Sequence, residues 1–171
     1  LICEEVESQN ADAIVSPANF NAVGQIVIAG NEVGVDKAVE QATALGKRAV
    51  PLNVSVPSHC RLMQPASDKL AAEFANVTFN APTIPVIQNR HARVEADSDA
   101  IKQALIEQLS LPVLWSATEN RLADKHIKLQ IECGSGNVLT NLAKRQAQKV
   151  PALATDKVAK LDEIRQALQG E

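Results

Sequence analysis

Residues 13–30 read A-I-V-S-P-A-N-F-N-A-V-G-Q-I-V-I-A-G and contain two short apolar runs of the kind that form neighbouring strands. The first run, Ala13–Ser16, predicts a strand that ends at Pro17, and the second run, Gln25–Ala29, predicts its partner. Residues that favour turns lie between the two runs: Asn19, Asn21 and Gly24. The stretch therefore predicts a β-hairpin.

Elements on both sides of the hairpin extend the pattern. Leu1–Ser8 has the apolar spacing of a helix end, and Asn31–Leu45 repeats apolar residues three and four apart, which predicts a second helix. Arg48–Val56 predicts a strand, with Pro51 indicating an edge position or a bulge. This order is typical of a ferredoxin-like β-α-β-β-α-β unit without its first strand. We therefore predict that residues 1–55 are the remainder of a ferredoxin-like small subdomain, incomplete at its start.

Residues 56–171 mix helical and extended patterns, which indicates a second, α/β subdomain. Alternating apolar residues predict a strand at Ile127–Ile131, and a short extended piece follows at Ala152–Ala154. The predicted helices are Leu62–Phe74, Ser98–Leu109 with Ser98 as its cap, Trp115–Leu122, Val138–Gln148 and Val158–Leu168. These strands are too few for a complete sheet, so we predict the C-terminal part of a large α/β subdomain.

Composition excludes several classes of protein. A net charge of −3 over 171 residues argues against a nucleic-acid binder, and 2% aromatic residues argue against a stacking platform for bases or sugars. Three cysteines without a C-x-x-C pair argue against a disulfide framework, and no metal site is predicted. No apolar run approaches the ~20 residues of a membrane span. We expect a cytoplasmic protein without a nucleic-acid or membrane partner.

Histidine supplies the strongest chemical candidate. His59 lies in V-S-V-P-S-H-C, between a predicted strand and a predicted helix, where α/β enzymes often place catalytic groups. Imidazole suits general base catalysis near neutral pH. A plain core or surface histidine is the alternative interpretation. His91 and His126 have charged neighbours, and we expect both to be solvated.

Other candidates are weaker. The chain has no G-x-S-x-G nucleophile motif, and Cys60 is interpreted as small packing material beside the histidine. Gly134–Gly136 reads G-S-G, which is compatible with phosphate binding but more typical of a plain turn. Lys47 and Arg48, with Asn21 from the hairpin, form a possible site for a phosphorylated ligand, and plain solvation is the alternative.

Five segments, in order along the chain, resemble the malonyl-CoA:acyl carrier protein transacylases of dissociated bacterial fatty acid synthesis. They are Val15–Gly30, Pro51–Cys60, Phe79–Val86, Gln108–Trp115 and Gly134–Leu142. The resemblance implies an α/β-hydrolase-like large subdomain with an inserted ferredoxin-like small subdomain. It also implies that the chain is the C-terminal part only, because the family's G-Q-G-S-Q segment, G-H-S-L-G elbow and malonyl-binding arginine belong upstream.

The resemblance implies an acyltransferase that moves malonyl from coenzyme A to an upstream serine and then to the phosphopantetheine thiol of acyl carrier protein. By the family's pattern, His59 is the general base and the main-chain carbonyl of Gln108 holds its imidazole N–H. An orienting acceptor of this kind fixes the tautomer and supports the imidazolium as it forms. The coenzyme A thioester is the substrate, and no cofactor is implied. We expect this chain alone to be inactive, since it lacks the nucleophile.

The resemblance also implies binding residues and partners. Asn21, Lys47 and Arg48 would lie along the coenzyme A channel, and Lys144 and Arg145 would meet the acidic carrier protein. A solvated helix face is the alternative for the second group. The implied partners are malonyl-CoA, acyl carrier protein and the missing N-terminal part of the same protein.

Two other functions remain open at this point. One is a non-catalytic ferredoxin-like binding module for a nucleotide or a protein partner. The other is a transacylase domain of a modular synthase. Pro57-Ser58-His59 follows the dissociated bacterial form, from which we infer malonyl as the acyl group, while Ser135 stands where the family often has proline.

Overall fold

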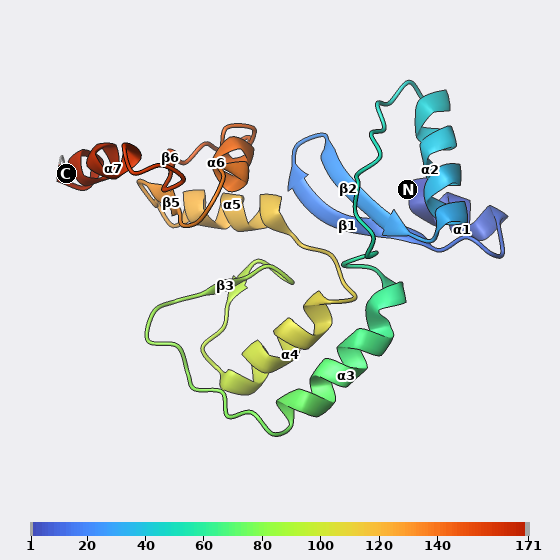
Figure 1. Ribbon diagram of the computed structural model, residues 1–171, viewed down its shortest axis with the longest axis horizontal. Coiled ribbons are helices and arrows are strands. Elements are labelled where there is room, and N and C mark those ends of the chain that lie inside the picture. Colours follow the sequence, from blue (N-terminus) through green and yellow to red (C-terminus); the bar gives the residue numbers. More distant parts are fainter. Residues whose placement is uncertain (1, 170–171) are drawn as a thin grey trace. The chain divides into compact units, whose positions relative to one another are not determined.

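The predicted hairpin is present in the computed structural model, which describes residues 2–169 (Figure 1). Its strands are β1 (Val15–Ala22) and β2 (Gln25–Gly30), which pair in a two-stranded sheet. The turn is tight, and its Gly24 has a φ of 73°, a left-handed value that glycine adopts without steric penalty.

Strand β1 is longer than predicted, because it continues through Pro17 instead of ending there. The prediction that Asn19 and Asn21 lie in the turn is wrong for the same reason, since both belong to β1. Pairing on the second edge of β1 supports the extension. The N–H of Phe20 donates to the carbonyl of Val113 at 2.9 Å, and the N–H of Val113 donates back to β1 at 2.9 Å. These bonds hold the strand extended although proline has no N–H for a sheet.

Helices α1 (Ile2–Gln9) and α2 (Glu32–Ala44) confirm the two helices predicted around the hairpin. With the hairpin they enclose a core whose buried members are Cys3, Val6, Ala13, Val15 and Ala38. Helix α2 approaches the start of β1 closely, since a Cβ at Gly34 would lie 2.4 Å from the backbone oxygen of Ile14. The Oδ1 of Asn31 accepts the N–H groups of both residues at 2.9 Å, which caps α2 and fixes it to the hairpin.

The predicted strand Arg48–Val56 is wrong, because the chain is irregular there and pairs with no strand of the described residues. A strand needs a neighbour for its backbone groups, and Pro51 removes one donor as well. Four alternating apolar side chains are consequently more than half exposed: Val50, Leu52, Val54 and Val56. We call residues 48–56 the exposed apolar segment. The described chain has the helix, strand, strand, helix order of the predicted unit without its last strand.

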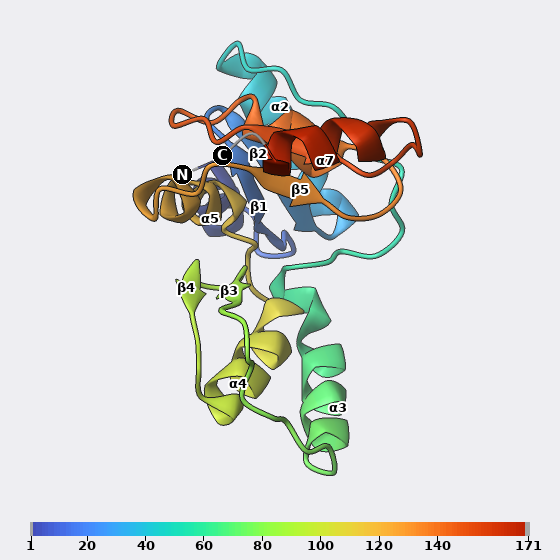
Figure 2. The same cartoon turned by 90° about the vertical axis from the view of Figure 1, so that its left-hand side faces the viewer.

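Two packed helices follow this segment. A short 3₁₀ turn, η1 (Arg61–Met63), leads into α3 (Gln64–Phe74), which lies beside α4 (Ser98–Gln108) in both views (Figures 1 and 2). The loop between them contains the antiparallel pair β3 (Ile87–Gln88) and β4 (Arg93–Val94). Both helices were predicted. The cap of α4 is Asp97 rather than the predicted Ser98, because the Asp97 Oδ1 accepts the N–H of Ala100 at 2.8 Å.

The remaining elements are α5 (Trp115–Asp124), β5 (Gln130–Glu132), α6 (Val138–Ala143), β6 (Ala152–Ala154) and α7 (Lys160–Gln169). Strands β5 and β6 are parallel, with Gln130 opposite Ala152. Helix α6 ends five residues before its predicted end. The Gln146 Nε2 donates to the carbonyl of Leu142 at 3.3 Å, so a side chain takes a place that a helical N–H would occupy.

The described chain divides into two compact units. The first contains the residues up to Phe20 together with Ile26–Leu114, and the second contains Asn21–Gln25 and the residues from Trp115 onward. The predicted boundary between residues 55 and 56 stays a prediction. Within residues 2–169, no helix combines the length and the apolar character that crossing a bilayer requires.

Candidate active site

His59 is held at two points by the carboxyl end of α4. Its ring Nδ1 lies 2.7 Å from the carbonyl oxygen of Gln108, and its backbone N–H donates to the carbonyl of Leu109 at 3.0 Å. The residue is half-buried and has a φ of 66°, a left-handed value that is uncommon outside glycine but more frequent for histidine, asparagine and aspartate than for other residues. The backbone is therefore bent to bring the imidazole onto the helix end.

The last turn of α4 offers carbonyls with spare acceptor capacity. Three of them accept a bond from a residue elsewhere in the fold. The buried Ser67 Oγ on α3 donates to the carbonyl of Ile106 at 2.7 Å, one turn from the two carbonyls that hold His59. The Gln108 side chain donates to the carbonyl of Leu111 at 3.1 Å, which stabilises the chain as it leaves the helix. The contact predicted between the His59 ring and the Gln108 main-chain carbonyl is present in the structure.

This arrangement decides the tautomer of His59. A carbonyl oxygen can only accept, so Nδ1 carries the proton and Nε2 is left with its lone pair. The His59 ring is therefore prepared to take a proton at Nε2.

The other histidines and the cysteine next to His59 were also assigned from the sequence. Cys60 is buried, and its Sγ donates to the carbonyl of Pro57 at 3.2 Å, as expected for packing material. The expectation that His91 is solvated is wrong, because its side chain is 20% exposed and its Nε2 lies 3.3 Å from Glu95. His126 is exposed as predicted.

Lys47 and Arg48 lie in the same compact unit as His59, directly after α2. Gly46, with a φ of 68°, follows the end of that helix and turns the chain. Both basic side chains are exposed, so the structure leaves them accessible to an anionic ligand.

Asn21, Lys144 and Arg145 lie in the second unit. The carbonyl of Asn21 accepts a hydrogen bond from the Gln146 Nε2 at 2.8 Å, and the Arg145 Nη1 donates to the Gln25 Oε1 at 2.7 Å. The end of α6 and the hairpin tip are therefore bonded to each other. Lys144 is exposed beside them.

The Gly134–Gly136 turn is explained by its neighbours. Glu132 accepts the N–H groups of Leu139 and Thr140 at 3.0 and 2.8 Å, so its carboxylate occupies the start of α6. Desolvation raises the pKa of Glu132, but these backbone hydrogen bonds outweigh it and hold the pKa below its ordinary value. An internal carboxylate already fills the place of a phosphate, which supports the plain turn.

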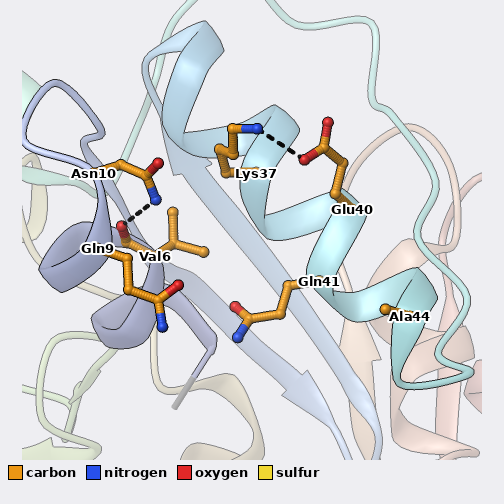
Figure 3. Close-up of a pocket in the computed structure, with 7 residues that line it drawn as sticks. All are labelled: Val6, Gln9, Asn10, Lys37, Glu40, Gln41 and Ala44. Atoms are coloured by element: carbon orange, nitrogen blue, oxygen red, sulfur yellow. Dashed lines mark hydrogen bonds and ion pairs between the residues drawn. The ribbon is translucent and has the colours of Figure 1, made fainter.

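A hollow of about 310 Å³ lies between α1 and α2 (Figure 3). Its lining residues are Val6, Gln9, Asn10, Lys37, Glu40, Gln41 and Ala44. Lys37 is paired with Glu40 at 3.0 Å, and none of the predicted site residues lines the hollow. In the part of the chain that the structure describes, no three His, Cys, Asp or Glu residues gather as a metal site.

Comparison with known proteins supplies the context for this geometry. The chain is 48% identical over 153 residues to malonyl CoA-acyl carrier protein transacylase of Escherichia coli strain K12, which covers 89% of this chain and 48% of that protein. This chain is homologous to the malonyl-CoA:acyl carrier protein transacylases. It spans about half the length of the curated transacylases that it matches. No family model matches the chain.

Solved transacylase structures agree with the fold. FabD from Acinetobacter baumannii superposes with a TM-score of 0.94 at 38% identity, covering 99% of this chain and 54% of that one. A malonyl-transacylase solved in complex with a type II polyketide synthase acyl-carrier protein superposes with a TM-score of 0.90 at 42% identity, covering 99% and 53%. The α/β content of the chain fits these transacylases.

Sequence reasoning missed two buried polar residues that support the candidate site residues. Ser67 and Gln146 are each 2% exposed, and each bonds to a backbone carbonyl far away in the sequence. Ser67 lies within a predicted helix whose apolar spacing gives no sign of a buried hydroxyl, and Gln146 lies in a polar stretch typical of a surface. Neither has a local sequence signal.

Proposed function

We propose that the complete protein transfers malonyl from coenzyme A to acyl carrier protein and that this chain supplies its general base. The observation that carries the proposal is the bond between the His59 Nδ1 and the Gln108 carbonyl at 2.7 Å. The homology to transacylases supports the same reading. No observation favours the binding-module alternative.

The proposed reaction is a double displacement at a serine outside this chain. His59 Nε2 takes the proton of the serine hydroxyl while the serine oxygen attacks the thioester carbon of malonyl-CoA. The carbon–sulfur bond then breaks, and the imidazolium returns the proton to the leaving thiolate. In the second half, His59 takes the proton of the carrier's phosphopantetheine thiol, whose sulfur attacks the malonyl-serine ester. The serine leaves and recovers its proton, so the enzyme is unchanged.

We further propose the finer architecture and partners. Residues 1–55 would belong to a ferredoxin-like small subdomain, and residues 56–171 to an α/β-hydrolase-like large subdomain. Asn21, Lys47 and Arg48 would contact coenzyme A. No cofactor besides the thioester substrate is needed for this chemistry, and we expect the protein to act in the cytoplasm.

Lys144 and Arg145 are the proposed contacts with the acidic carrier protein. Both side chains are exposed, and a solved malonyl-transacylase complexed with its acyl-carrier protein resembles this chain over 99% of its length. The rest of the same protein, including the serine, is the third proposed partner.

Replacing His59 in the complete protein tests the proposed function. H59N should lower malonyl transfer by about 10²–10⁴-fold, because the serine loses its proton acceptor. Asparagine tolerates the left-handed backbone of residue 59, so folding and coenzyme A affinity should be retained. Transfer rate, thermal melting and coenzyme A binding measure the three effects.

His126 provides a matched control, because it also has a left-handed φ, of 57°, but is exposed and has no proposed role. H126N should transfer malonyl as the wild type does. Near-normal turnover by folded H59N would remove His59 from the mechanism, and absence of malonyl transfer by the wild-type protein would refute the proposed function itself.

The exposed pair Lys47 and Arg48 gives a separate prediction. Replacing both by alanine should raise KM for malonyl-CoA by about two- to tenfold at low salt, with less effect at high salt, because exposed charge contacts are screened. Steady-state kinetics at several ionic strengths measure this. The double variant K125A/K128A removes two exposed charges elsewhere and should leave KM unchanged. If KM for malonyl-CoA is the same in K47A/R48A and the wild type at every ionic strength, the two side chains are only solvated and do not contact coenzyme A.

A further inference from the structure

Gln146 is a buried amide that joins three parts of the second unit. It is 2% exposed and lies just beyond the end of α6. Its Nε2 donates to the carbonyls of Asn21 at 2.8 Å and Leu142 at 3.3 Å, and its Oε1 accepts from the Ser116 Oγ at 3.1 Å. The hairpin tip, the last turn of α6 and the first turn of α5 therefore meet at one side chain.

The bond to the hairpin tip is made with a main-chain atom. It fixes the position of the Asn21 backbone and does not engage that residue's side chain. The neighbouring Arg145 reaches the far side of the tip, where its Nη1 donates to the Gln25 Oε1 at 2.7 Å. Residues 145 and 146 thus hold both ends of the five-residue tip, one by an exposed bond and one by a part-buried bond.

Burial makes the Gln146 bonds the stronger restraint. An exposed hydrogen bond is exchanged readily with water, whereas a buried amide that loses its partner keeps its desolvation penalty. The tip is also a tight turn in which Val23 is 75% exposed and the buried apolar residue is the small Ala22, so little packing holds it in place. Gln146 is consequently the residue best placed to set the tip against α6.

We infer that Gln146 is a positioning residue that sets Asn21 for the phosphopantetheine arm that coenzyme A and acyl carrier protein share. This inference rests on the proposed function, in which Asn21 lies along the substrate channel and Lys144 and Arg145 meet the carrier. Because both substrates present the same arm, a displaced tip should weaken both to a similar degree. Chemistry at the serine should be little affected, since Gln146 touches neither reacting atoms nor His59.

The test is Q146L in the complete protein, with leucine keeping most of the side-chain volume. KM should rise about three- to tenfold for both malonyl-CoA and acyl carrier protein, while kcat stays within about twofold. Q148L changes an exposed glutamine two residues away and should leave both values of KM unchanged. S116A removes only the partner of Oε1, keeps the bond to the tip, and should also leave KM unchanged.

A second variant, Q146E, tests the role of Gln146 if Q146L does not fold. Q146E is isosteric, and its carboxyl can donate to the Asn21 carbonyl only while it is protonated. Its KM for both substrates should therefore rise with pH relative to the wild type, with kcat following the wild-type pH profile. Equal KM values in the wild type and the folded variants would overturn the inference. A loss of kcat or thermal stability without a change in KM would do so too. A wild type without malonyl transfer would instead refute the proposed function.

Discussion

Glu119 on α5 is completely buried, although it carries an ionisable group. One carboxyl oxygen accepts from the Gln130 Nε2 at 2.7 Å, and the other is buried without a hydrogen-bond partner among the described residues. Burial raises the pKa of Glu119, and the bond from Gln130 only partly offsets this. Burial therefore disfavours the ionised form of this carboxyl.

The sign of the pH effect follows from proton binding. As pH rises above the ordinary value of 4.5, the unfolded chain loses the Glu119 proton before the folded chain does. The folded state then binds more protons, so the free energy of unfolding decreases with rising pH until the raised pKa is passed. E119Q should remove this decrease and be more stable than the wild type at neutral pH, because a neutral amide replaces the carboxylate.

Denaturant unfolding of the complete protein, as wild type and as E119Q, over a series of pH values measures this difference. E73Q, which changes an exposed carboxyl on α3, should show the pH dependence of the wild type. Parallel curves for the wild type and E119Q would mean that Glu119 does not titrate with folding.

At the scale of elements, the close contact between α2 and β1 is possible because residue 34 is a glycine and has no side chain. A Cβ at Gly34 would lie 2.4 Å from the Ile14 oxygen, which is a backbone atom and has little freedom to move. Alanine normally stabilises a helix interior by about 1 kcal/mol relative to glycine, but overpacking against backbone costs more. G34A should therefore lower the free energy of unfolding, by about 1–3 kcal/mol.

Thermal or denaturant unfolding of G34A in the complete protein measures that loss. V33A, at the exposed neighbouring position, should change stability by no more than about 0.5 kcal/mol. A G34A variant more stable than the wild type would mean that α2 moves away from β1 at little cost.

The same elements explain which parts of the fold could be predicted. The helices were predictable because their apolar spacing and end signals are local, as at α2 with Asn31 before it and Gly46 after it. Arg48–Val56 has the alternation of a strand, but a strand forms only where a partner supplies hydrogen bonds, and local sequence contains no information on that partner. The strand was predicted to end at Pro17, but backbone pairing with Val113 keeps it extended. The local sequence gives no sign of that pairing.

Some contacts of the candidate site could likewise be predicted from the sequence, and others could not. His59 and Gln108 could be paired beforehand through the family resemblance, and the structure has their atoms 2.7 Å apart. The bond between Gln146 and Asn21 spans 125 residues and lies in no motif. The prediction that His91 is solvated was wrong because Glu95, one of its charged neighbours in the sequence, lies against its ring in the structure.

At the scale of the whole molecule, the exposed apolar segment is a liability. Its Val50, Leu52, Val54 and Val56 are more than half exposed, and its backbone is not paired in a sheet. Unpaired extended backbone with apolar side chains favours association with other chains. We expect the 171-residue chain by itself to self-associate and to unfold without a cooperative transition.

Light scattering on a sizing column and a thermal melt measure these properties. The variant L52K/V54K should associate less, since two charges interrupt the apolar row. Mass spectrometry after incubation with malonyl-CoA should find no malonyl adduct, because the chain has no G-x-S-x-G elbow. A monodisperse monomer would contradict the first expectation, and an adduct at a defined serine would contradict the second.

The acceptor that orients His59 belongs to the main chain, and this affects how the site can change during evolution. No codon specifies a carbonyl, so substitutions of the Gln108 side chain leave that acceptor in place, and residue conservation at this position is a poor guide to its importance. A one-residue deletion within α4 is different, because it would rotate the terminal carbonyls by about 100° around the helix axis, away from the imidazole. We therefore expect insertions and deletions within α4, rather than substitutions at position 108, to disrupt the orientation of His59.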